Sequence, residues 1–296
     1  MDNKSLRIGF IGAGRAANAL AMGLQDSGYR VTSAASRTMS SAQALAQRIE
    51  GCAALEKPQD VADDCDLVFL TVPDNAIEAV ARDVRWRSGI SVVHCSGAES
   101  ASILDQAQWQ GALTGSFHPM QTFPSDAKAS FSGVAFAVEG LSPLLDTLKE
   151  MACDLGGWPV EIRPEHRALY HLSGFLSCGL VTSLVDQATQ LWKAMGYTKE
   201  QGLEVLLPLL KSTMESLETR GIDMALTGPI SRGDVGTVKR HLDALDRYAP
   251  SLVPLYCNLA LGAVTISRNK GSIDQSVETE LTNLLKDQLL ETARYS

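Results

Sequence analysis

The sequence of 296 residues has no run of basic residues, and its 26 Lys and Arg are outnumbered by 34 Asp and Glu. Proteins that bind nucleic acid neutralise phosphates with such runs, so the net charge of −8 argues against a nucleic-acid partner. The six cysteines show no Cys-x-x-Cys spacing, which argues against a metal site and fits a reduced, cytoplasmic protein. The start of the chain has no long apolar signal core.

Long apolar runs are few, and only Ala168–Val185 and Tyr248–Ser267 are uncharged over a length that needs weighing as a membrane span. Both carry polar residues such as His171 and Asn258, which are costly in hydrocarbon. We therefore expect buried helices of a soluble bundle or dimer interface, and no membrane partner.

The pattern of apolar residues changes near Arg163. Before it, short apolar runs alternate with Ala-rich helical stretches, and after Pro164 leucines recur at helical spacing. The sequence predicts an α/β fold: a doubly wound Rossmann sheet in residues 1–163, followed by an all-helical domain in residues 164–296. The predicted strands are Leu6–Ile11, Arg30–Ala35, Asp66–Val72, Ser91–Cys95, Ala112–Ser116, Val134–Val138 and Pro159–Ile162.

A glycine-rich turn follows the first predicted strand and precedes a helical run. Gly12 would permit the tight turn, Gly14 would let a pyrophosphate approach the backbone, and Ala17 would let the helix pack closely on the strand. The helix N-terminus would then offer free N–H groups to the anion. The turn predicts a dinucleotide site, although a purely structural turn has the same pattern. Its residues are Gly12, Ala13, Gly14, Arg15, Ala16 and Ala17.

The end of the second predicted strand has no acidic residue. An NAD enzyme would place Asp or Glu there to bind the ribose 2′-hydroxyl, whereas this chain has Ser36, Arg37 and Thr38. Because a guanidinium binds a phosphate as a fork, the segment predicts NADP as the cofactor. The alternative is a solvated arginine.

Two loops after later strands are expected to flank the cofactor, since ligands of doubly wound sheets lie beyond the carboxyl ends of the strands. Val72 and Pro73, followed by Asp74, would give an apolar wall for adenine or ribose, and Ser96 with Gly97 would approach the nicotinamide. Both loops are also compatible with ordinary turns.

Three segments carry candidate catalytic groups. His118, followed by a proline, is placed to donate to a carbonyl oxygen, or else is a buried structural histidine. Arg167 and His171 share one face of a predicted helix, which is either catalytic or a polar seam. Arg232 is a candidate clamp for a substrate carboxylate, and Asp234 is expected to cap a helix; the two could instead form a pair that only holds the loop.

The assembled motifs resemble a bacterial family that joins a Rossmann-like NADP-binding domain to an uncharacterised helical domain. The motifs are Gly12-x-Gly14-Arg15, His94–Ala98, Phe117–Phe123, Arg167–His171, Thr227–Asp234 and Thr237–Leu242. The family is similar to the 6-phosphogluconate dehydrogenase-like reductases, which include pyrroline-5-carboxylate reductase, and some members resemble an alternative ketopantoate reductase. The resemblance also implies a homodimer through the helical domain that buries the helix Tyr248–Ser267.

The resemblance implies an NADPH-dependent oxidoreductase that reduces a small carbonyl compound, with ketopantoate as a possible 2-keto acid substrate. We expect Arg167 to stabilise the developing charge, His118 or His171 to supply the proton, and Arg232 to bind a carboxylate. The chain departs from the family pattern at two positions. The family commonly has Lys where this chain has Arg167, and Asn near the position of Gly179. These changes motivate the alternative of a non-catalytic NADP-binding redox sensor or scaffold.

Overall fold

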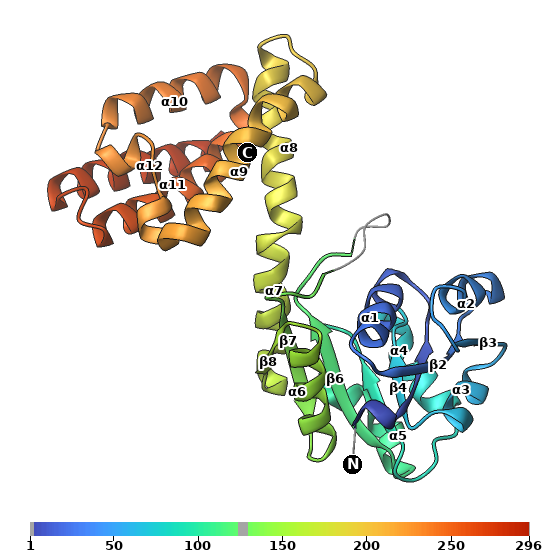
Figure 1. Ribbon diagram of the computed structural model, residues 1–296. Helices are drawn as coiled ribbons and strands as arrows, with labels where there is room; N and C mark the ends of the chain where they lie inside the picture. Colours follow the sequence, from blue (N-terminus) through green and yellow to red (C-terminus); the bar gives the residue numbers. More distant parts are fainter. Residues whose placement is uncertain (1–2, 124–129, 296) are drawn as a thin grey trace. The chain divides into compact units, whose positions relative to one another are not determined.

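The computed structural model describes residues 3–123 and 130–295, and it divides the chain into two compact units, Met1–Cys178 and Gly179–Ser296 (Figure 1). The division falls 15 residues later than the boundary expected at Arg163. The reason is that helix α7 (Arg167–Ser177) is bound to the sheet of the first unit through Arg167 and Tyr170. Helical periodicity alone marks where α7 begins but not which unit it packs against.

The first unit contains an eight-stranded sheet in the order β3-β2-β1-β4-β5-β6-β7-β8. Neighbouring strands are parallel except β6 and β7, so the predicted doubly wound sheet is confirmed. The sequence missed β3 because three residues are too few to show a periodicity. The strands are β1 (Arg7–Ile11), β2 (Arg30–Ala35), β3 (Ala53–Leu55), β4 (Leu67–Leu70), β5 (Ser91–His94), β6 (Leu113–Pro119), β7 (Ala135–Gly140) and β8 (Trp158–Glu161).

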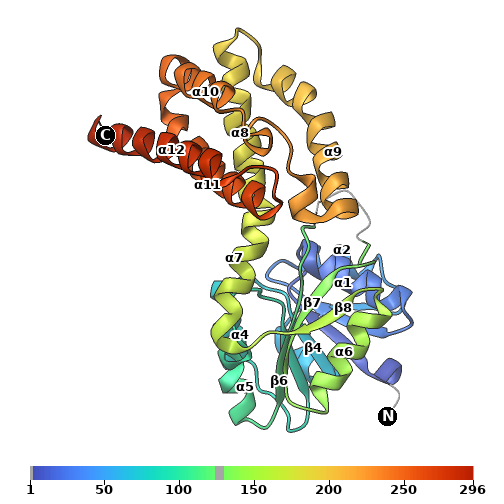
Figure 2. The same cartoon turned by 90° about the vertical axis from the view of Figure 1, so that its left-hand side faces the viewer.

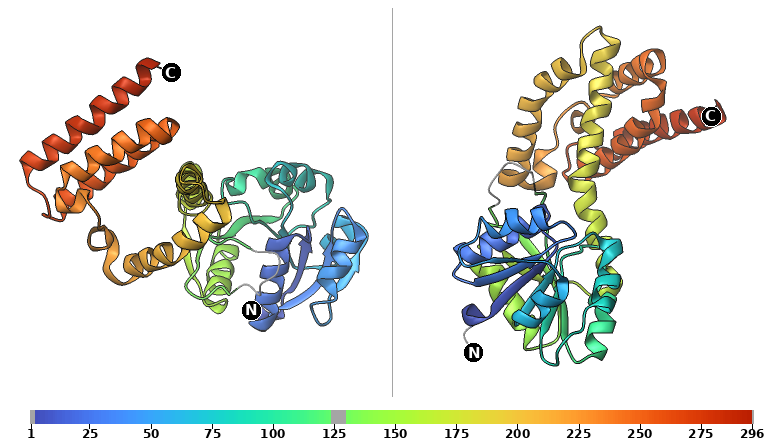
Figure 3. Two further views of the ribbon diagram at one scale, coloured as in Figure 1. Left: turned by 90° about the horizontal axis from the view of Figure 1, so that it is seen from above. Right: turned by 90° about the vertical axis from the view of Figure 1, so that its right-hand side faces the viewer.

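Helices cover both faces of this sheet (Figures 1 and 3). Side chains alternate along β1, so that Phe10 packs against the layer of α1 and α6 while Ile11 packs against the layer of α3, α4 and α5. Helix α1 turns a buried apolar stripe to the sheet, with Ala17, Leu20 and Leu24 at helical spacing. The helices are α1 (Arg15–Asp26), α2 (Met39–Ala46), α3 (Pro58–Asp64), α4 (Asp74–Asp83), α5 (Asp105–Trp109) and α6 (Leu144–Asp154).

The second unit is helical, as predicted. Its core lies among α10, α11 and α12, and the last two pack side by side (Figures 2 and 3). Helices α8 and α9 bury little, and α9 departs from helical geometry at Gly221. The helices are α8 (Gly179–Ala194), α9 (Lys199–Ala225), α10 (Val235–Tyr248), α11 (Val253–Asn269) and α12 (Gln275–Tyr295).

Within the described residues, the stretches Pro164–Ala194 and Pro250–Asn269 are long and apolar enough to meet a length and composition criterion for a membrane span. We expect each to be a buried helix of a soluble bundle or of a dimer interface. The most apolar window of the first is 0% buried within one chain and that of the second 28%, so for the first stretch only the dimer interface of these two alternatives stays a prediction. The first stretch also contains Arg167, whose guanidinium is buried in an ion pair of the first unit.

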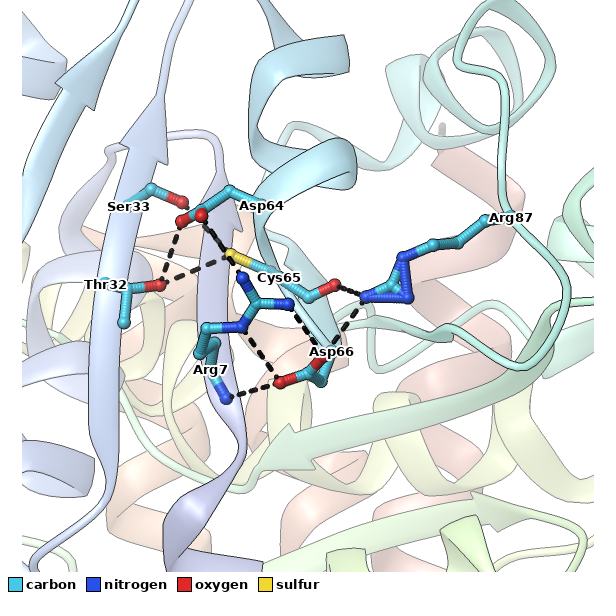
Figure 4. A network of polar contacts seen from close by, with 7 residues as sticks. All are labelled: Arg7, Thr32, Ser33, Asp64, Cys65, Asp66 and Arg87. Atoms are coloured by element: carbon cyan, nitrogen blue, oxygen red, sulfur yellow. Dashed lines mark hydrogen bonds and ion pairs between the residues drawn. The ribbon is translucent and has the colours of Figure 1, made fainter.

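A network of charged groups closes the amino ends of the central strands (Figure 4). The guanidinium of Arg7 on β1 donates to both carboxylate oxygens of Asp66, at 3.2 and 3.1 Å, and Arg87 binds the same carboxylate. These bonds lower the pKa of Asp66. The thiol of Cys65 lies beside them and contacts the Ser33 hydroxyl at 3.0 Å. Burial raises the pKa of this thiol, which makes Cys65 unreactive.

Candidate functional site

At the opposite ends of these strands, the turn after β1 is held in one geometry by its neighbours. Gly12 has φ +107°, and a Cβ there would lie 2.5 Å from the carbonyl oxygen of Thr71, so only glycine fits. Its N–H donates to Ala35 on β2 at 2.8 Å, and its carbonyl accepts from the Thr71 hydroxyl at 2.9 Å. The turn is therefore fixed between β2 and β4 before any ligand arrives.

The start of α1 has the features of an anion site. A Cβ built on Gly14 would meet nothing within 4 Å, so the backbone there is open to a close approach. No side chain among the described residues caps α1, and the Asn18 amide instead donates to the carbonyls of Ala13 and Gly14. Ala17 is fully buried against the sheet. The N–H groups of Arg15, Ala16 and Ala17, in the first helical turn, therefore suit a pyrophosphate.

The segment after β2 presents an unengaged guanidinium. Arg37 is exposed, and within residues 3–123 and 130–295 it forms no hydrogen bond or ion pair. Arg15 is also exposed and without such a partner in the same residues. Thr38 precedes α2, and its hydroxyl contacts that of Ser41 at 2.7 Å, while Ser36 is half-buried. This donor set suits a phosphate on the ribose.

The β4–α4 loop carries one of the charges of the site. Val72 is half-buried, and Pro73 and Asp74 are exposed at the start of α4. The carboxylate of Asp74 acts to raise the pKa values of His94 and His118, which shows that it lies within electrostatic reach of both.

His94 organises the β5 loop from inside. Its Nδ1 accepts from the Ser96 N–H at 3.2 Å, so Nε2 carries the hydrogen and donates to the Ser100 carbonyl at 3.1 Å. Burial lowers its pKa to about 4, helped by the charge of Arg167. The Ser96 hydroxyl accepts from the backbone N–H groups of Ala98 and Glu99, which come directly after Gly97. This hydroxyl, which we expected near the nicotinamide, thus also has a structural role inside the loop.

His118 is the last residue but one of β6, and its ring lies between Gly97 and Tyr170. Nδ1 lies 2.8 Å from the Tyr170 hydroxyl, and a Cβ on Gly97 would lie 2.8 Å from Nε2. Burial, with smaller contributions from His171 and Arg167, lowers the pKa of His118 to about 4. His118 is therefore neutral at physiological pH, and an imidazolium acid is not its resting form.

Arg167 is the most deeply buried charged residue of the site, with 1% of its surface exposed. Its Nε and Nη2 donate to Glu139 on β7 at 3.0 and 2.9 Å, and Nη2 also binds the Ser116 hydroxyl on β6. Glu139 in turn accepts from the Ala101 N–H at 3.0 Å. Nη1 is buried and has no partner among the described residues, which leaves one donor for a water or a ligand.

The remaining predicted catalytic residues are distributed differently. His171 is exposed on α7, one turn beyond Arg167, and lies within electrostatic reach of His118. Arg232 and Asp234 belong to the second unit. Asp234 caps α10 by accepting from the Thr237 N–H at 2.9 Å, as predicted, and these bonds lower its pKa. Within the described residues Arg232 forms no direct bond to Asp234, but its charge contributes to the lowered pKa of that carboxylate.

The structure thus brings together His118, Arg167, the Gly97 turn and Asp74, all from one unit. It adds three residues that the sequence did not single out: Ser116 and Glu139, which hold Arg167, and Tyr170, which holds His118. Only Tyr170 had a signal, because it shares a helix face with Arg167. No group of three or more potential metal ligands occurs within the part of the chain that the structure describes.

Comparison with known families agrees with this architecture. Residues 1–119 match a family described as a Rossmann-like domain, and residues 134–262 match a domain of unknown function, DUF2520. The chain joins a Rossmann-like domain to a DUF2520 domain. The DUF2520 match begins before β7, so the β7 strand that carries Glu139 and the α7 helix that carries Arg167 and Tyr170 belong to the same family segment.

Solved structures of reductases share this fold. A Bacteroides fragilis protein, named by inference as an NADP oxidoreductase, is 26% identical over 89% of this chain and 100% of its own, with a TM-score of 0.70. Pyrroline-5-carboxylate reductase from Streptococcus pyogenes is 16% identical over 90% and 99% of the two chains, with a TM-score of 0.61. A reductive aminase from Aspergillus terreus in complex with NADPH is 17% identical over 97% and 94%, with a TM-score of 0.60. No curated protein matches the chain.

Proposed function

We propose that this protein is an NADPH-dependent oxidoreductase that reduces a small carbonyl compound, with 2-keto acids such as ketopantoate as first candidates. The observation that carries the proposal is the carboxyl edge of the sheet. There a glycine turn, an uncapped helix and the unengaged Arg37 lie at the same edge of the sheet as the His118 ring. The named relatives that bind NADP or reduce with it support the cofactor.

The residues present fit the cofactor. The open backbone at Gly14 and the first turn of α1 would hold the pyrophosphate, and Arg37 would bind the 2′-phosphate. Bound NADPH would supply the hydride. His118 and the free Nη1 of Arg167 are the donors available to stabilise a developing negative oxygen, and solvent would supply the proton.

The cofactor preference is tested by Arg37→Ser, which removes the fork but keeps a small polar side chain. We expect about a tenfold to hundredfold loss of NADPH affinity in calorimetric titration and little change for NADH. Arg30→Ser is the matched control, because Arg30 is exposed at the amino end of the same strand. Equal losses for both cofactors would contradict the assignment.

The reaction is tested by NADPH consumption with a panel of 2-keto acids, ketopantoate included, and of cyclic imines such as pyrroline-5-carboxylate. Turnover at ordinary enzyme rates, about 1 per second or faster, is the expected result for one member. Absence of turnover across the panel, with tight NADPH binding intact, would favour the alternative of a redox sensor or scaffold. Engagement of Arg167 by Glu139 is the observation that keeps this alternative in view.

We further propose that the second unit pairs with a second copy of the chain. The chain exposes 16252 Å². Two separate globules of the sizes of its units would together expose only about 14,600 Å². The excess of about 1,600 Å² exceeds the ~800 Å² that each partner buries in a stable interface.

The face concerned is defined by two adjoining apolar hollows of about 750 and 320 Å³, which share Leu191, Leu245 and Tyr256. The outer face of α11 contributes to it, whereas its inner face is buried against α12. Sedimentation should show a wild-type dimer and a monomeric Leu191→Glu variant. Leu141→Glu, at an exposed leucine of the first unit, should remain dimeric. A monomeric wild type would refute the pairing.

A further inference from the structure

We infer that Tyr170 is a positioning residue that holds His118 in the tautomer with its hydrogen on Nε2, so that a neutral N–H donor faces the Gly97 turn. The use of this donor in catalysis rests on the proposed reductase function. The tautomer itself is a property of the protein alone and is tested without cofactor or turnover.

The geometry of the two rings supports this direction of donation. The Tyr170 oxygen lies 2.8 Å from His118 Nδ1 and 3.3 Å from the His118 carbonyl oxygen. A phenol is a better donor than acceptor, and an imidazole nitrogen that lacks hydrogen is a good acceptor. The hydroxyl has one hydrogen, which we assign to the shorter contact with Nδ1, and the longer contact, in which the same O–H donates to the carbonyl oxygen, shares that hydrogen. The rings meet edge to face at 87°, with centroids 5.5 Å apart.

The other edge of the His118 ring lies against Gly97, where there is no side chain to exclude it. A Cβ on Gly97 would lie 2.8 Å from both Cε1 and Nε2, so only glycine lets the ring occupy this place. Nε2 has no hydrogen-bond partner within the described residues. With Nδ1 engaged by Tyr170, the Nε2 hydrogen remains free for a bound molecule.

The surroundings keep both rings uncharged. Burial lowers the pKa of His118 to about 4, together with electrostatic contributions from His171 and Arg167, both on α7. Asp74 at the start of α4 acts in the opposite direction, and buried His94 on β5 is the other titratable neighbour. Burial also raises the pKa of Tyr170 to about 12. The donor is consequently present without change between about pH 5.5 and 9.

A neutral N–H has a defined chemical use. It stabilises a developing negative oxygen by a hydrogen bond but does not transfer its proton, because neutral imidazole is a very weak acid. His118 therefore acts on an oxygen of the bound molecule as a fixed donor. The proton that completes the product comes from solvent rather than from this ring.

The test is nitrogen-15 imidazole spectroscopy of the full-length protein without cofactor, with His118 identified among the five histidines by loss of its signals in His118→Gln. We expect hydrogen on Nε2, a bare Nδ1 and no protonation between pH 8 and about 5.5. Tyr170→Phe should give a mixture of tautomers at His118. His94 is the internal control, because backbone groups alone fix its tautomer and its signals should not change.

Hydrogen on Nδ1 in the wild type, or protonation of His118 near pH 6.5, would overturn the inference without any variant. Unchanged His118 signals in Tyr170→Phe, with His94 intact, would overturn the role of Tyr170. Should the His94 signals show that this variant is unfolded, incorporation of 3-fluorotyrosine replaces it. That residue is a stronger donor, and the Nδ1 signal should shift. A loss of NADPH turnover in the substrate panel alone would leave the tautomer standing and count only against the proposed reduction.

Discussion

The two ends of the central strands are built from similar residue types but differ in how far their polar groups are satisfied. At the amino ends, Arg7 and Arg87 both bind Asp66. At the carboxyl ends, Arg37 is unengaged within the described residues and the first turn of α1 has no capping side chain. Buried polar groups of a folded protein normally find partners, and the buried Nη1 of Arg167 has none among the described residues, so the carboxyl end is the one that suits a ligand.

The two ends also differ in how deeply their ion pairs are buried. The side chains of Arg7 and Asp66 are 40% and 34% exposed, whereas those of Arg167 and Glu139 are 2% and 16% exposed. An exposed pair stabilises weakly because water competes for both charges, and a buried pair is costly to break because one charge is left without a partner. The four predictions below test these differences between the two ends of the strands.

The largest effect is expected from Arg167→Met, which leaves the carboxylate of Glu139 buried without its partner. The unfolding free energy in urea should fall by about 3–5 kcal/mol. Adding Glu139→Gln removes the charge and keeps an acceptor for the Ala101 N–H, so the double variant should recover part of the loss. A loss below about 1 kcal/mol would make the buried pair equivalent to an exposed one and remove the contrast.

Gly14→Ala separates the ligand site from the fold. The added methyl group meets nothing in the protein, and the backbone angles there suit alanine, so stability should change by no more than about 1 kcal/mol. NADPH binding should weaken on the order of 100-fold, because the methyl group occupies the space needed for the pyrophosphate. Titration calorimetry measures the affinity, and Gly262→Ala, which is also open, is the control. Unchanged affinity would place the cofactor elsewhere.

The pH dependence of stability reports the two neutral histidines. The pKa values of His94 and His118 are about 4 in the folded protein and near 6.5 when unfolded, so the unfolded chain binds more protons below pH 6.5. Stability should be constant above about pH 7.5 and fall as the pH drops from 6.5 toward 4. The loss is about 2 kcal/mol per histidine by pH 5. His118→Gln should remove roughly half of this slope in urea titrations at several pH values, and an unchanged slope would show that His118 is not neutral.

The sequence predicted the fold and the geometry of the glycine turn better than the contacts around Arg167 and His118, for a physical reason. Strand periodicity and the turn at Gly12 are local, since each depends on residues a few positions apart. The partners of Arg167 and His118 are not local: Ser116 lies 51 residues from Arg167, and Tyr170 lies 52 residues from His118. The steric role of Gly97 likewise depends on a ring from another strand. Such pairings come from the order of the strands, which no short motif encodes.

The smallest effect is expected from Arg7→Met at the amino ends. Asp66 keeps Arg87 and the backbone N–H of residue 7 as partners, so the loss at pH 7 should be under about 1 kcal/mol. Because the bond from Arg7 lowers the pKa of Asp66, the contribution is present above the unfolded pKa and disappears as acid protonates the carboxylate. Urea titrations at pH 7 and pH 3, in a double-mutant cycle with Asp66→Asn, measure it. NADPH affinity should be unaffected, since the network lies at the far ends of the strands. A loss as large as that of Arg167→Met would show that exposure does not separate the two ion pairs, and a fall in NADPH affinity would show that the two ends are coupled.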